Sequence, residues 1–597
     1  MTTARPTPGV PADLTALVQL ARGHHRAGRL AEAADAYRKA LHLRPDLADV
    51  HNDLGILLAQ QGNVDAALAH LEQAVALKPT FAEGHNNLGI VLRSQGKLDQ
   101  AEVHYRQSLA LKPDYADAHN NLGNLLLSQG KLKQATACYT KALALRPGYA
   151  EAHNNLATAL KDQGQLDKAA ASYRQAIALR PNYAEAHNNL GSVLRELHQL
   201  DQAAASFEQA IALRPDLAEA HNNLGTSLAQ RNQLDQATAR YQQAIALRPD
   251  FAEAHNNLGM VLKDQGQLDQ AAARYQLAIS LRPDMGEAHL GLATCYLCQG
   301  DYERGWPALE GRRHIPGILP PTNLPRWNGQ ELAGRSLLLL AEQGLGDTIH
   351  FVRYARLLKQ RGARVVLACQ RALGWLLSSL PDLDELFFYG SADELPHCDF
   401  YLPLLSAPGA LGTTAATIPH DVPYLAADPA LADSWRGELA GIEGFKIGIA
   451  WQGSPDYRFD CFRSIPLSEL APLARVPGVR LLSLQKGFGS EQLTTVDFPV
   501  IDLASRLDEA AGPFMDTAAV IGGLDLVVSA NTAIAHLAGA LGAPVWVALQ
   551  FSPDWRWLRD REETPWYPSM RLFRQGAVNR WDEVFERMAA RVQARRP

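Results

Sequence analysis

The sequence predicts a two-part fold, in which an all-α solenoid of stacked helix pairs precedes an α/β region of two Rossmann-like lobes. Two observations predict this fold. In the first half a motif that begins with His returns every 34 residues, which is a spacing typical of stacked helix–turn–helix units. In the second half this period stops, and short apolar runs alternate with amphipathic helices. At 597 residues the chain is long enough for more than one core.

Composition excludes several classes of protein. The net charge of -6 argues against a general nucleic-acid binder. The sequence contains no run of eighteen apolar residues, so it predicts no membrane-spanning helix. The first residues lack the apolar stretch of a signal peptide, and the six scattered cysteines suit a reducing compartment, so we expect a cytoplasmic protein. Cys295-x-x-Cys298 has a redox or zinc spacing, but it stands alone in a repeat helix and is interpreted as packing.

The repeats should occupy residues 14–313, after a disordered tail at 1–13. Most copies read A-E-A-H-N-N-L-G, then Q-G-Q-L-D-Q-A, and then an aromatic residue and small residues before a Pro that ends the second helix. This frame resembles the tetratricopeptide repeat. A divergent first unit begins at Leu14 and an incomplete ninth at Gly286. The seven units between them begin at residues 48, 82, 116, 150, 184, 218 and 252.

A column of identical amides stands two residues after the motif His. Because an amide donates and accepts together, such a ladder could hold a peptide backbone, or it could bond neighbouring helices as part of the repeat architecture. The array also resembles the Asn ladder of the O-linked N-acetylglucosamine transferases, which implies binding of an acceptor protein. The column comprises Asn87, Asn121, Asn155, Asn189, Asn223 and Asn257. The His column beside it, from His85 to His255, is expected to be structural, since its spacing is not that of metal ligands.

A Pro-rich connector is predicted at residues 314–334. Trp306 and Trp327 flank it and are expected to fasten the array to the second half of the chain, because exposed Trp would be costly. Beyond the connector we predict a first lobe at 335–430, a second lobe at 431–575 and a final helix at 576–597. In sheets of this type, ligands bind at the carboxyl ends of the strands.

Three strand-end loops carry candidate chemistry. The first contains Gly344, Gly346 and Asp347, where Asp347 could act on a substrate or serve as a helix N-cap. The second contains Gln485 and Lys486, with Glu491 shortly after, a set that suits a phosphate and a ribose. The third runs from Ser529 to His536 and is a strand-to-helix turn suited to a diphosphate. The chain has neither G-x-G-x-x-G nor G-K-S/T, so a dinucleotide or P-loop enzyme is not supported.

From about residue 335 the sequence resembles the bacterial heptosyltransferase-like glycosyltransferases of family 9, which have the GT-B fold. The matching motifs are E-Q-G-L-G-D-T, W-Q-G-S-P with F-R-S-I-P-L, S-L-Q-K-G, N-T-A-I-A-H-L-A-G-A-L-G, and P-D-W-R-W-L-R-D-R with P-W-Y-P-S-M-R-L-F-R-Q. The resemblance implies that Asp347 is the general base and that Glu491 holds the ribose. It also implies that the final helix crosses back onto the first lobe. The donor diphosphate would then be held by Thr532, Ala533 and His536.

Two positions depart from the pattern of those relatives. Asn531 stands where they usually carry Asp, and Cys461 stands where they usually carry Arg, although Asp460 and Arg463 are kept. Asn531 can still cap the helix after it. Arg463 and Lys486 remain available for the diphosphate, so no metal ion and no cofactor beyond the donor substrate is required. Asp382-Leu383-Asp384 resembles a metal-binding D-x-D but is interpreted as surface.

The sequence is compatible with three hypotheses of function. In the first, the protein is a metal-independent glycosyltransferase that moves a sugar from a nucleotide-diphosphate sugar to a protein or peptide held in the repeat groove. In the second, it is a scaffold whose lobes are a degenerate nucleotide-sugar sensor. In the third, the acceptor is a glycan or a lipid-linked molecule. A homodimer is also possible. The sequence names neither the sugar, nor the nucleotide base, nor the acceptor.

Overall fold

The computed structural model of the chain describes residues 12–342, 344–389, 396–454, 460–552, 554–559 and 561–595. It forms two compact units, one ending at Gln236 and the other beginning at Ala237. The predicted tail lies outside the described residues except for its last two positions, where the first helix already begins. The side chain of Cys461 also lies outside what is described.

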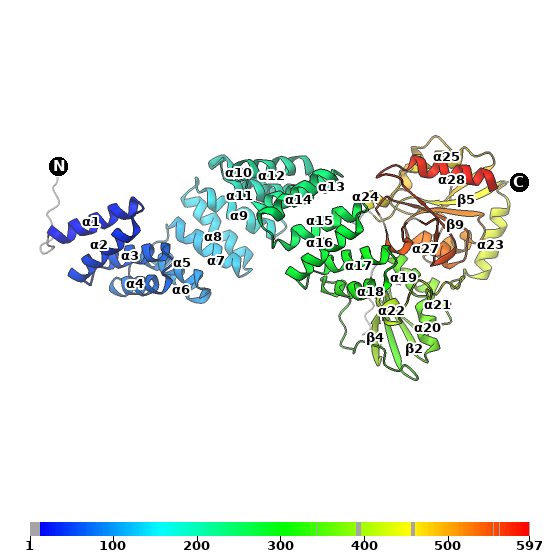
Figure 1. Ribbon diagram of the computed structural model, residues 1–597, viewed down its shortest axis with the longest axis horizontal. Helices are drawn as coiled ribbons and strands as arrows, with labels where there is room; N and C mark the ends of the chain where they lie inside the picture. The colour runs from blue at the N-terminus through cyan, green and yellow to red at the C-terminus, as the bar shows by residue number, and fades with distance from the viewer. Residues whose placement is uncertain are drawn as a thin grey trace. The chain divides into compact units, whose positions relative to one another are not determined.

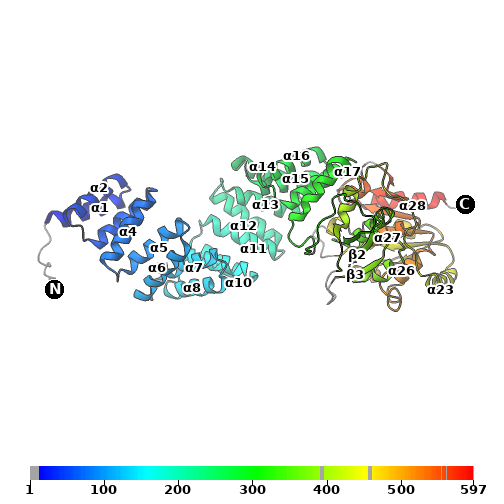
Figure 2. The ribbon, with the colours of Figure 1, turned by 90° about the horizontal axis from the view of Figure 1, so that it is seen from below.

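Regularly paired helices make up the first unit, and Figure 2 shows the pairs succeeding one another along the array. The predicted unit starts are confirmed, because every first helix from α3 to α15 begins at the expected Ala. The helices are α1 (Ala12–Arg26), α2 (Leu30–Leu43), α3 (Ala48–Gln60), α4 (Val64–Leu77), α5 (Ala82–Ser94), α6 (Leu98–Leu111), α7 (Ala116–Ser128), α8 (Leu132–Leu145), α9 (Ala150–Asp162), α10 (Leu166–Leu179), α11 (Ala184–Glu196), α12 (Leu200–Leu213) and α13 (Ala218–Gln230). The unit boundary falls within α14 (Leu234–Leu247).

Each helix pair closes where a glycine of the first helix meets an aromatic ring of the second. A Cβ added to Gly89 would lie 2.7 Å from Cε1 of Tyr105, and one added to Gly123 would lie 2.6 Å from Cε1 of Tyr139. Both rings are fully buried. The motif Gly is therefore selected by the close approach of the two helices.

The motif His residues are structural, as expected. In each unit the ring Nε2 lies at hydrogen-bonding distance from the carbonyl oxygen of the Pro that closes the preceding unit, for example 3.1 Å between His85 and Pro79. The same pair recurs at His119 with Pro113 and at His153 with Pro147. This bond joins the first helix of one unit to the end of the unit before it.

The second unit begins with the last repeats, α15 (Ala252–Asp264), α16 (Leu268–Leu281), α17 (Gly286–Cys298) and α18 (Tyr302–Glu310). The ninth repeat, expected to be incomplete, has both helices, although α18 is only 9 residues long. Trp306 of α18 is buried, and its Nε1 donates to the carbonyl of Thr413 at 2.8 Å. Trp327 is buried as well. As predicted, Trp306 fastens these repeats to the α/β region.

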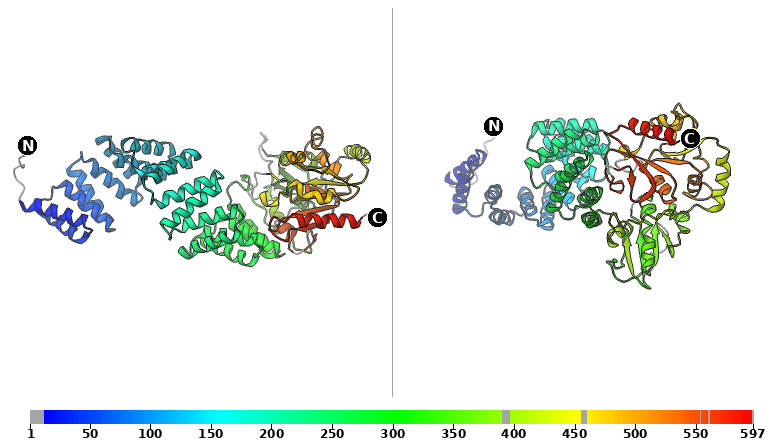
Figure 3. Two further views of the ribbon diagram at one scale, coloured as in Figure 1. Left: turned by 90° about the horizontal axis from the view of Figure 1, so that it is seen from above. Right: turned by 45° about the vertical axis from the view of Figure 1, so that its right-hand side comes forward.

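Two open sheets form the α/β region (Figures 1 and 3). The first has the order β3-β2-β1-β4 and is parallel throughout. The second has the order β10-β11-β9-β8-β5-β6-β7 and is parallel except between β10 and β11. The strands are β1 (Ser336–Leu340), β2 (Arg364–Cys369), β3 (Glu385–Phe388), β4 (Phe400–Pro403), β5 (Phe445–Ala450), β6 (Val479–Ser483), β7 (Val500–Asp502), β8 (Leu526–Ala530), β9 (Val545–Leu549), β10 (Glu563–Thr564) and β11 (Tyr567–Arg574).

Helices and short 3₁₀ segments connect these strands. The helices are α19 (Leu345–Phe351), α20 (Tyr354–Gln360), α21 (Gly374–Ser378), α22 (Ala407–Ala410), α23 (Pro429–Ala440), α24 (Asp460–Arg463), α25 (Ala471–Ala474), α26 (Met515–Ile521), α27 (Ala533–Ala540) and α28 (Asp582–Arg595). Two 3₁₀ segments matter for the site, η1 (Gly311–His314) and η6 (Trp555–Trp557). Every described helix is too short or too polar to span a lipid bilayer.

The final helix does not cross onto the first lobe, so that expectation was wrong. Its apolar face, with Val584, Phe585 and Met588, joins the core of the second sheet beside Ile447 and Trp451. Figure 1 shows α28 next to α25, which belongs to the same lobe. The helix is amphipathic, and the second sheet supplies the complementary apolar surface.

Candidate functional site

The predicted Gly-rich loop and the predicted diphosphate turn lie against each other. The loop begins α19 after β1, and the turn begins α27 after β8. A Cβ added to Gly346 would lie 3.0 Å from Cδ2 of His536 and 3.3 Å from Cα of Ala533. Only a residue without a side chain fits there easily, which explains the second Gly of the loop. Gly344 precedes α19 and has open space around it.

Asp347 is paired with an arginine that was not among the candidates predicted from the sequence. Its carboxylate accepts a hydrogen bond from Nη2 of Arg556, and both side chains are largely buried, with 15% and 12% exposed. The N-cap position of α19 belongs to Gly344, and Asp347 lies in the first turn. The alternative interpretation of Asp347 as a helix N-cap is therefore wrong.

Asn531 does not cap α27, contrary to the prediction from the sequence, but hydrogen-bonds to two residues of another segment. Its Nδ2 donates to Asp554 at 2.9 Å, and its Oδ1 accepts from Nε1 of Trp557 at 3.0 Å. The N-cap of α27 is Thr532, whose hydroxyl lies 3.2 Å from that of Ser529. The amide therefore fixes the segment that carries Arg556, since Asp554 and Trp557 flank that residue.

Arg556 lies between two carboxylates. Its backbone N–H donates to Asp554 at 2.9 Å and its Nη1 donates to the same carboxylate at 3.2 Å, while Nη2 holds Asp347. Burial alone would raise the pKa of the Asp554 carboxyl, but the charge of Arg556 and the hydrogen bonds from Arg556 and Asn531 together hold that pKa below its usual range. Burial alone would lower the pKa of the guanidinium, but the two carboxylates raise it, so Arg556 stays charged.

His536 is a neutral, fully enclosed side chain. Burial lowers its pKa to about 3, and the positive charge of Arg556 acts in the same direction. Its Nδ1 lies 3.2 Å from the Tyr567 hydroxyl and 3.2 Å from Nδ1 of His350, whose pKa burial also holds well below its usual value. As a neutral ring, His536 can donate a hydrogen bond but cannot supply a positive charge to a diphosphate.

Arg353 is a second buried cation near this cluster. Its guanidinium donates to the carbonyls of His350, Pro419 and Trp566 and to the Tyr424 hydroxyl, all of which are neutral. It also stacks over the rings of Tyr424 and Tyr567. A buried positive charge with neutral partners raises the electrostatic potential around it.

The other donor-site candidates lie in loops at the same edge of the second sheet, and their hydrogen bonds go to neighbouring residues of those loops. Gln485 is buried and ties two loops together, accepting from the backbone of Trp451 and Gln452 at 3.1 and 3.0 Å. Lys486 donates to Glu509 at 2.7 Å, so its charge is already paired.

Nε of Arg463 donates a hydrogen bond to Oδ1 of Asp460 at 2.8 Å. Glu491 is exposed near the start of a 3₁₀ segment. The structure brings Gly346, Asp347, Ala533 and His536 together, with Asn531 and Thr532 beside them. Among the described residues, no hydrogen bond or ion pair joins Gln485, Lys486 or Glu491 to that group.

Several functional candidates were missed from the sequence. Arg556 and Asp554 lie inside the motif P-D-W-R-W-L-R-D-R, so a signal for them existed, but a motif alone gives no partner. His350 and Tyr567 are 217 residues apart along the chain, and His350 and His536 are 186 apart. Their association depends on the docking of α19 against α27, which no local pattern predicts.

The last repeats contact the segment that carries Arg556. Ser552, shortly before η6, donates to Asp264 of α15 at 2.8 Å, and α17 packs on η6. Trp306 of α18 meets Trp555 edge to face at 5.6 Å between ring centroids, and Trp555 stacks with Phe351 of α19 at 5.9 Å. A continuous set of rings therefore joins the end of the array to the helix that carries Asp347.

A buried ion pair strengthens the same junction. Nη2 of Arg312 in η1 lies 2.7 Å from Glu342, at the end of β1, with 2% and 0% of the two side chains exposed. Arg312 also donates to the hydroxyl of Ser406 at 2.9 Å. The repeats of the second unit are thus held to the first sheet by a charged contact as well as by rings.

The Asn column forms a ladder with a second column, the Asn residues that directly follow the motif His one unit back. Nδ2 of Asn87 donates to Oδ1 of Asn52 at 2.9 Å, and Nδ2 of Asn121 donates to Oδ1 of Asn86 at 3.0 Å. Asn155, Asn189 and Asn223 repeat the pattern with Asn120, Asn154 and Asn188. Asn257 also has a polar partner. These bonds match the architectural alternative, and the side chains of the column stay half-buried, so acceptor binding stays a prediction.

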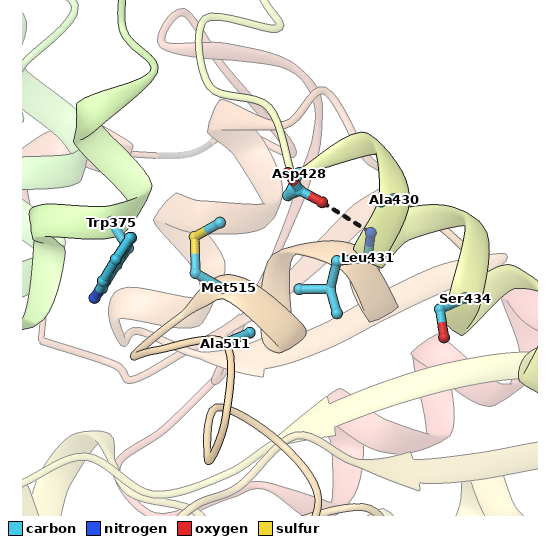
Figure 4. A pocket seen from close by; sticks show the side chains of 7 residues that line it. All are labelled: Trp375, Asp428, Ala430, Leu431, Ser434, Ala511 and Met515. Carbon is cyan, nitrogen blue, oxygen red and sulfur yellow. Dashed lines mark hydrogen bonds between the residues drawn. The ribbon is translucent and has the colours of Figure 1, made fainter.

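A cavity of about 460 Å³ opens between α21 and the beginnings of α23 and α26 (Figure 4). Trp375, Leu431 and Met515 form its apolar wall, and Asp428 caps α23 by accepting from the backbone of Leu431 at 2.9 Å. Trp375 is 64% exposed. The cavity is lined by residues other than the predicted site residues.

The remaining motifs have structural explanations. Cys295 and Cys298 are both buried and free, and burial raises the pKa of Cys295 to about 12. Asp384 of the D-x-D sequence is exposed and pairs with Lys359. Among the described residues, no three His, Cys, Asp or Glu side chains are grouped as a metal site would require.

Comparison with known proteins identifies the first half. A family model of the TPR repeat matches residues 24–62, 57–92, 91–130, 123–164, 158–198, 191–230 and 226–266, and a model of the tetratricopeptide repeat matches 262–305. Residues 24–305 are therefore tetratricopeptide repeats. Such arrays present extended surfaces to other proteins, so this is a repeat protein of the protein-interaction type.

The individual proteins that resemble this chain have low sequence identity to it and match it only in part. Protein FlbA of Caulobacter vibrioides is 28% identical over 344 residues, 50% of this chain and 54% of its own, so the chain spans about half the length of that relative. The Cut9–Hcn1 hetero-tetramer of the APC/C gives 20% identity over 47% of this chain and 55% of its own, with a TM-score of 0.38. The structure of YrrB, a TPR protein with an unusual peptide-binding site, is 26% identical in sequence and covers 31% of this chain and 95% of its own, with a TM-score of 0.27. The Pseudomonas aeruginosa pilF structure is 24% identical in sequence and covers 35% of this chain and 94% of its own, with a TM-score of 0.32.

Proposed function

We propose that the protein is a cytoplasmic glycosyltransferase of the GT-B type, which moves a sugar from a nucleotide-diphosphate sugar to a hydroxyl of a protein held by the repeats. The observation that carries the proposal is the direct contact between the last repeats and the segment that holds Asp347. A protein bound to these last repeats can thereby be presented next to a carboxylate at the strand ends of the first sheet.

The chemistry of the site supports transfer. Asp347 is a carboxylate that can accept the proton of an acceptor hydroxyl. The beginning of α27, the neutral His536 and the guanidinium of Arg556 are groups that can bind a diphosphate leaving group. The two sheets, parallel except between β10 and β11, have the helices after β1 and β8 in contact, and this supports a two-lobed GT-B arrangement.

A second candidate is a protein-interaction scaffold whose α/β region senses a nucleotide sugar without transferring it. Two observations favour it. The Asp347 carboxylate is paired with Arg556 instead of being free, and Asn531 is bonded to Asp554 and Trp557. Transfer to a glycan or lipid-linked acceptor is the third possibility.

A thermal-shift screen of the chain against nucleoside diphosphates and their sugars tests the donor site. Saturation at about a hundred times Kd would stabilise the binding lobe by about 2.7 kcal/mol. A clear shift with one nucleotide supports a donor site and identifies the substrate to label. The absence of a shift with every donor would contradict both the transferase and the sensor.

Transfer itself is tested with Asp347→Asn. We expect donor binding to be retained and the rate of transfer to fall by about 10²–10⁴-fold, because a general base is lost. Asp421→Asn is a matched control, since Asp421 is exposed on the same lobe. An unchanged rate in Asp347→Asn would show that another group is the base. If the unchanged chain has no transfer activity and Asn531→Asp with Cys461→Arg gains it, the degenerate sensor is supported.

A further inference from the structure

Arg556 holds the residue assigned as base and lies in the cluster assigned to the diphosphate. We infer that Arg556 is a diphosphate-binding catalytic residue that, without a bound donor, also locks Asp347 in an ion pair. An arriving diphosphate draws the guanidinium away from Asp347, so the base is free only when the donor is bound. This inference rests on the proposed function, because it assigns a further residue to the same site.

The two partners of Arg556 are not equivalent. Asp554 has contacts besides the guanidinium, since it accepts from Nδ2 of Asn531 and from the backbone N–H of Arg556, both at 2.9 Å. For Asp347, Arg556 is the described residue that holds the carboxylate. Asp554 therefore anchors the guanidinium from its own segment, while the bond to Asp347 joins two segments and can be exchanged.

The guanidinium has spare hydrogen-bonding capacity for an anion. Its Nε is buried and lacks a partner among the described residues. If Nη2 leaves Asp347, Nε and Nη2 together form the planar pair of donors that binds phosphate oxygens in a bidentate manner. Desolvated donors of this kind are costly to leave unsatisfied, so the buried Nε favours an anion at this position.

The position of Asp347 makes the exchange short. Asp347 follows Gly346, which touches Ala533 at the beginning of α27, and His536 of the same helix touches Gly346 as well. A diphosphate at the beginning of α27 therefore lies beside the Asp347–Arg556 pair. Arg353 adds a further positive charge to the surroundings, with its hydrogen bonds going to neutral oxygens.

The reaction balances with these groups. The acceptor oxygen forms a bond to the anomeric carbon of the sugar as the bond from that carbon to the phosphate oxygen breaks. The electron pair of the broken bond goes to the leaving diphosphate, whose added charge Arg556 stabilises. The proton of the acceptor hydroxyl goes to Asp347, and it is released to water when the diphosphate leaves and Arg556 returns to the carboxylate.

Calorimetry of the full chain with inorganic pyrophosphate measures the role of Arg556 independently of the nucleotide base. We expect Arg556→Gln to weaken binding at least tenfold and Arg556→Lys to weaken it less. Arg559→Gln, an exposed arginine shortly after η6, is the matched control and should bind as the unchanged chain does. Equal affinity in Arg556→Gln and in the control, or no binding of pyrophosphate by the unchanged chain, would overturn the inference.

The lock is tested by Asp347→Asn and by a structure with pyrophosphate bound. Asp347→Asn should bind pyrophosphate several-fold more tightly than the unchanged chain, and Asp347→Asn with Arg556→Gln should lose most of that gain. In the complex, Arg556 should contact a phosphate oxygen and no longer Asp347. A complex in which Arg556 still holds Asp347 would refute the lock, and this result is independent of whether Arg556→Gln folds.

The failures of the two proposals are distinguishable. If the pyrophosphate pattern holds and no donor supports transfer, Arg556 binds the anion and the transferase proposal fails. If transfer to a protein acceptor occurs and Arg556→Gln leaves both pyrophosphate affinity and turnover unchanged, the transferase stands and the assignment of Arg556 fails.

Discussion

At the scale of the residue, the polar columns of the repeats satisfy one another. The His rings contact Pro carbonyls of the preceding unit, and the Asn amides donate to Asn side chains one unit back. These hydrogen bonds hold neighbouring units in register. The same amides are half-buried and lie on the first helices, so a role in binding protein is compatible with the ladder.

A single substitution in the Asn column can distinguish a structural role of the ladder from a role in binding acceptor protein. Asn121→Ala removes the donor to the buried Oδ1 of Asn86 and should destabilise the array by about 1–3 kcal/mol, because a buried acceptor is left unsatisfied. Thermal unfolding of the full chain measures this effect, with the exposed Ser128→Ala of the same helix as control. Unchanged stability together with lost affinity for acceptor protein would mean that the ladder serves binding instead.

The buried imidazoles predict sensitivity to acid. Burial lowers the pKa of His536 from 6.5 to about 3, and that of His350 well below 6.5. Between these values and 6.5 the unfolded chain binds protons that the folded chain does not. Stability therefore falls as the pH falls below 6.5, by at most about 1.4 kcal/mol per pH unit for each ring.

Thermal unfolding between pH 7.5 and pH 5 checks this acid sensitivity. His536→Gln should lose part of the dependence, whereas substitution of the exposed His314 should keep all of it. Identical pH dependence in His536→Gln and in the unchanged chain would show that this ring is not held neutral by the fold.

At the scale of the element, η1 and η6 connect the array to the α/β region. Each of these short 3₁₀ segments carries one of the two arginines, Arg312 in η1 and Arg556 in η6. One arginine is used for a buried ion pair at the junction and the other for the site. The two segments meet the same repeats, since η1 and η6 both pack on α17.

Breaking the ion pair at η1 should loosen this junction. Glu342→Ala leaves the buried guanidinium of Arg312 without its carboxylate and should cost about 3–5 kcal/mol. Thermal unfolding and limited proteolysis of residues 314–334 measure the effect. Arg313→Ala is the matched control, because Arg313 is exposed in the same segment. Equal stability in the two variants would mean that the ring contacts of Trp306 alone hold the junction.

At the scale of the whole molecule, stacked repeats contribute to stability mainly through their nearest neighbours. The early repeats can therefore be removed without disturbing the contacts of α15, α17 and α18 with the α/β region. This separation allows the array and the α/β region to be assayed independently.

A chain shortened to residues 218–597 provides that assay. We expect it to keep its stabilisation by the donor diphosphate and to lose transfer to protein acceptor by about tenfold or more, because most of the acceptor-binding surface is gone. Transfer to a short hydroxyl acceptor should persist. Full transfer to protein by the shortened chain would contradict the role of the repeats, and transfer to a free glycan at the full rate would favour the third candidate.

The sequence by itself determined the repeats and most of the strands. Their signals are local, since the position of each helix follows from the periodic His, Gly and Pro, and each strand from an apolar run. It also placed Asp347 at a strand end and beside a glycine, which the contact between Gly346 and Ala533 explains. The edge strands β7 and β10, and the interior strand β11 within one of the matching motifs, were not expected.

Only the tertiary structure decided the partners. Arg556 pairs with Asp347 from 209 residues away, and Asn531 turns to Asp554 instead of capping its helix. The final helix packs on the second sheet, although its own amphipathic pattern would suit either lobe. A residue's own sequence neighbourhood determines its local conformation and its burial. The partner of its charge or apolar face depends on which elements dock, and that is settled by packing and electrostatics summed over the fold.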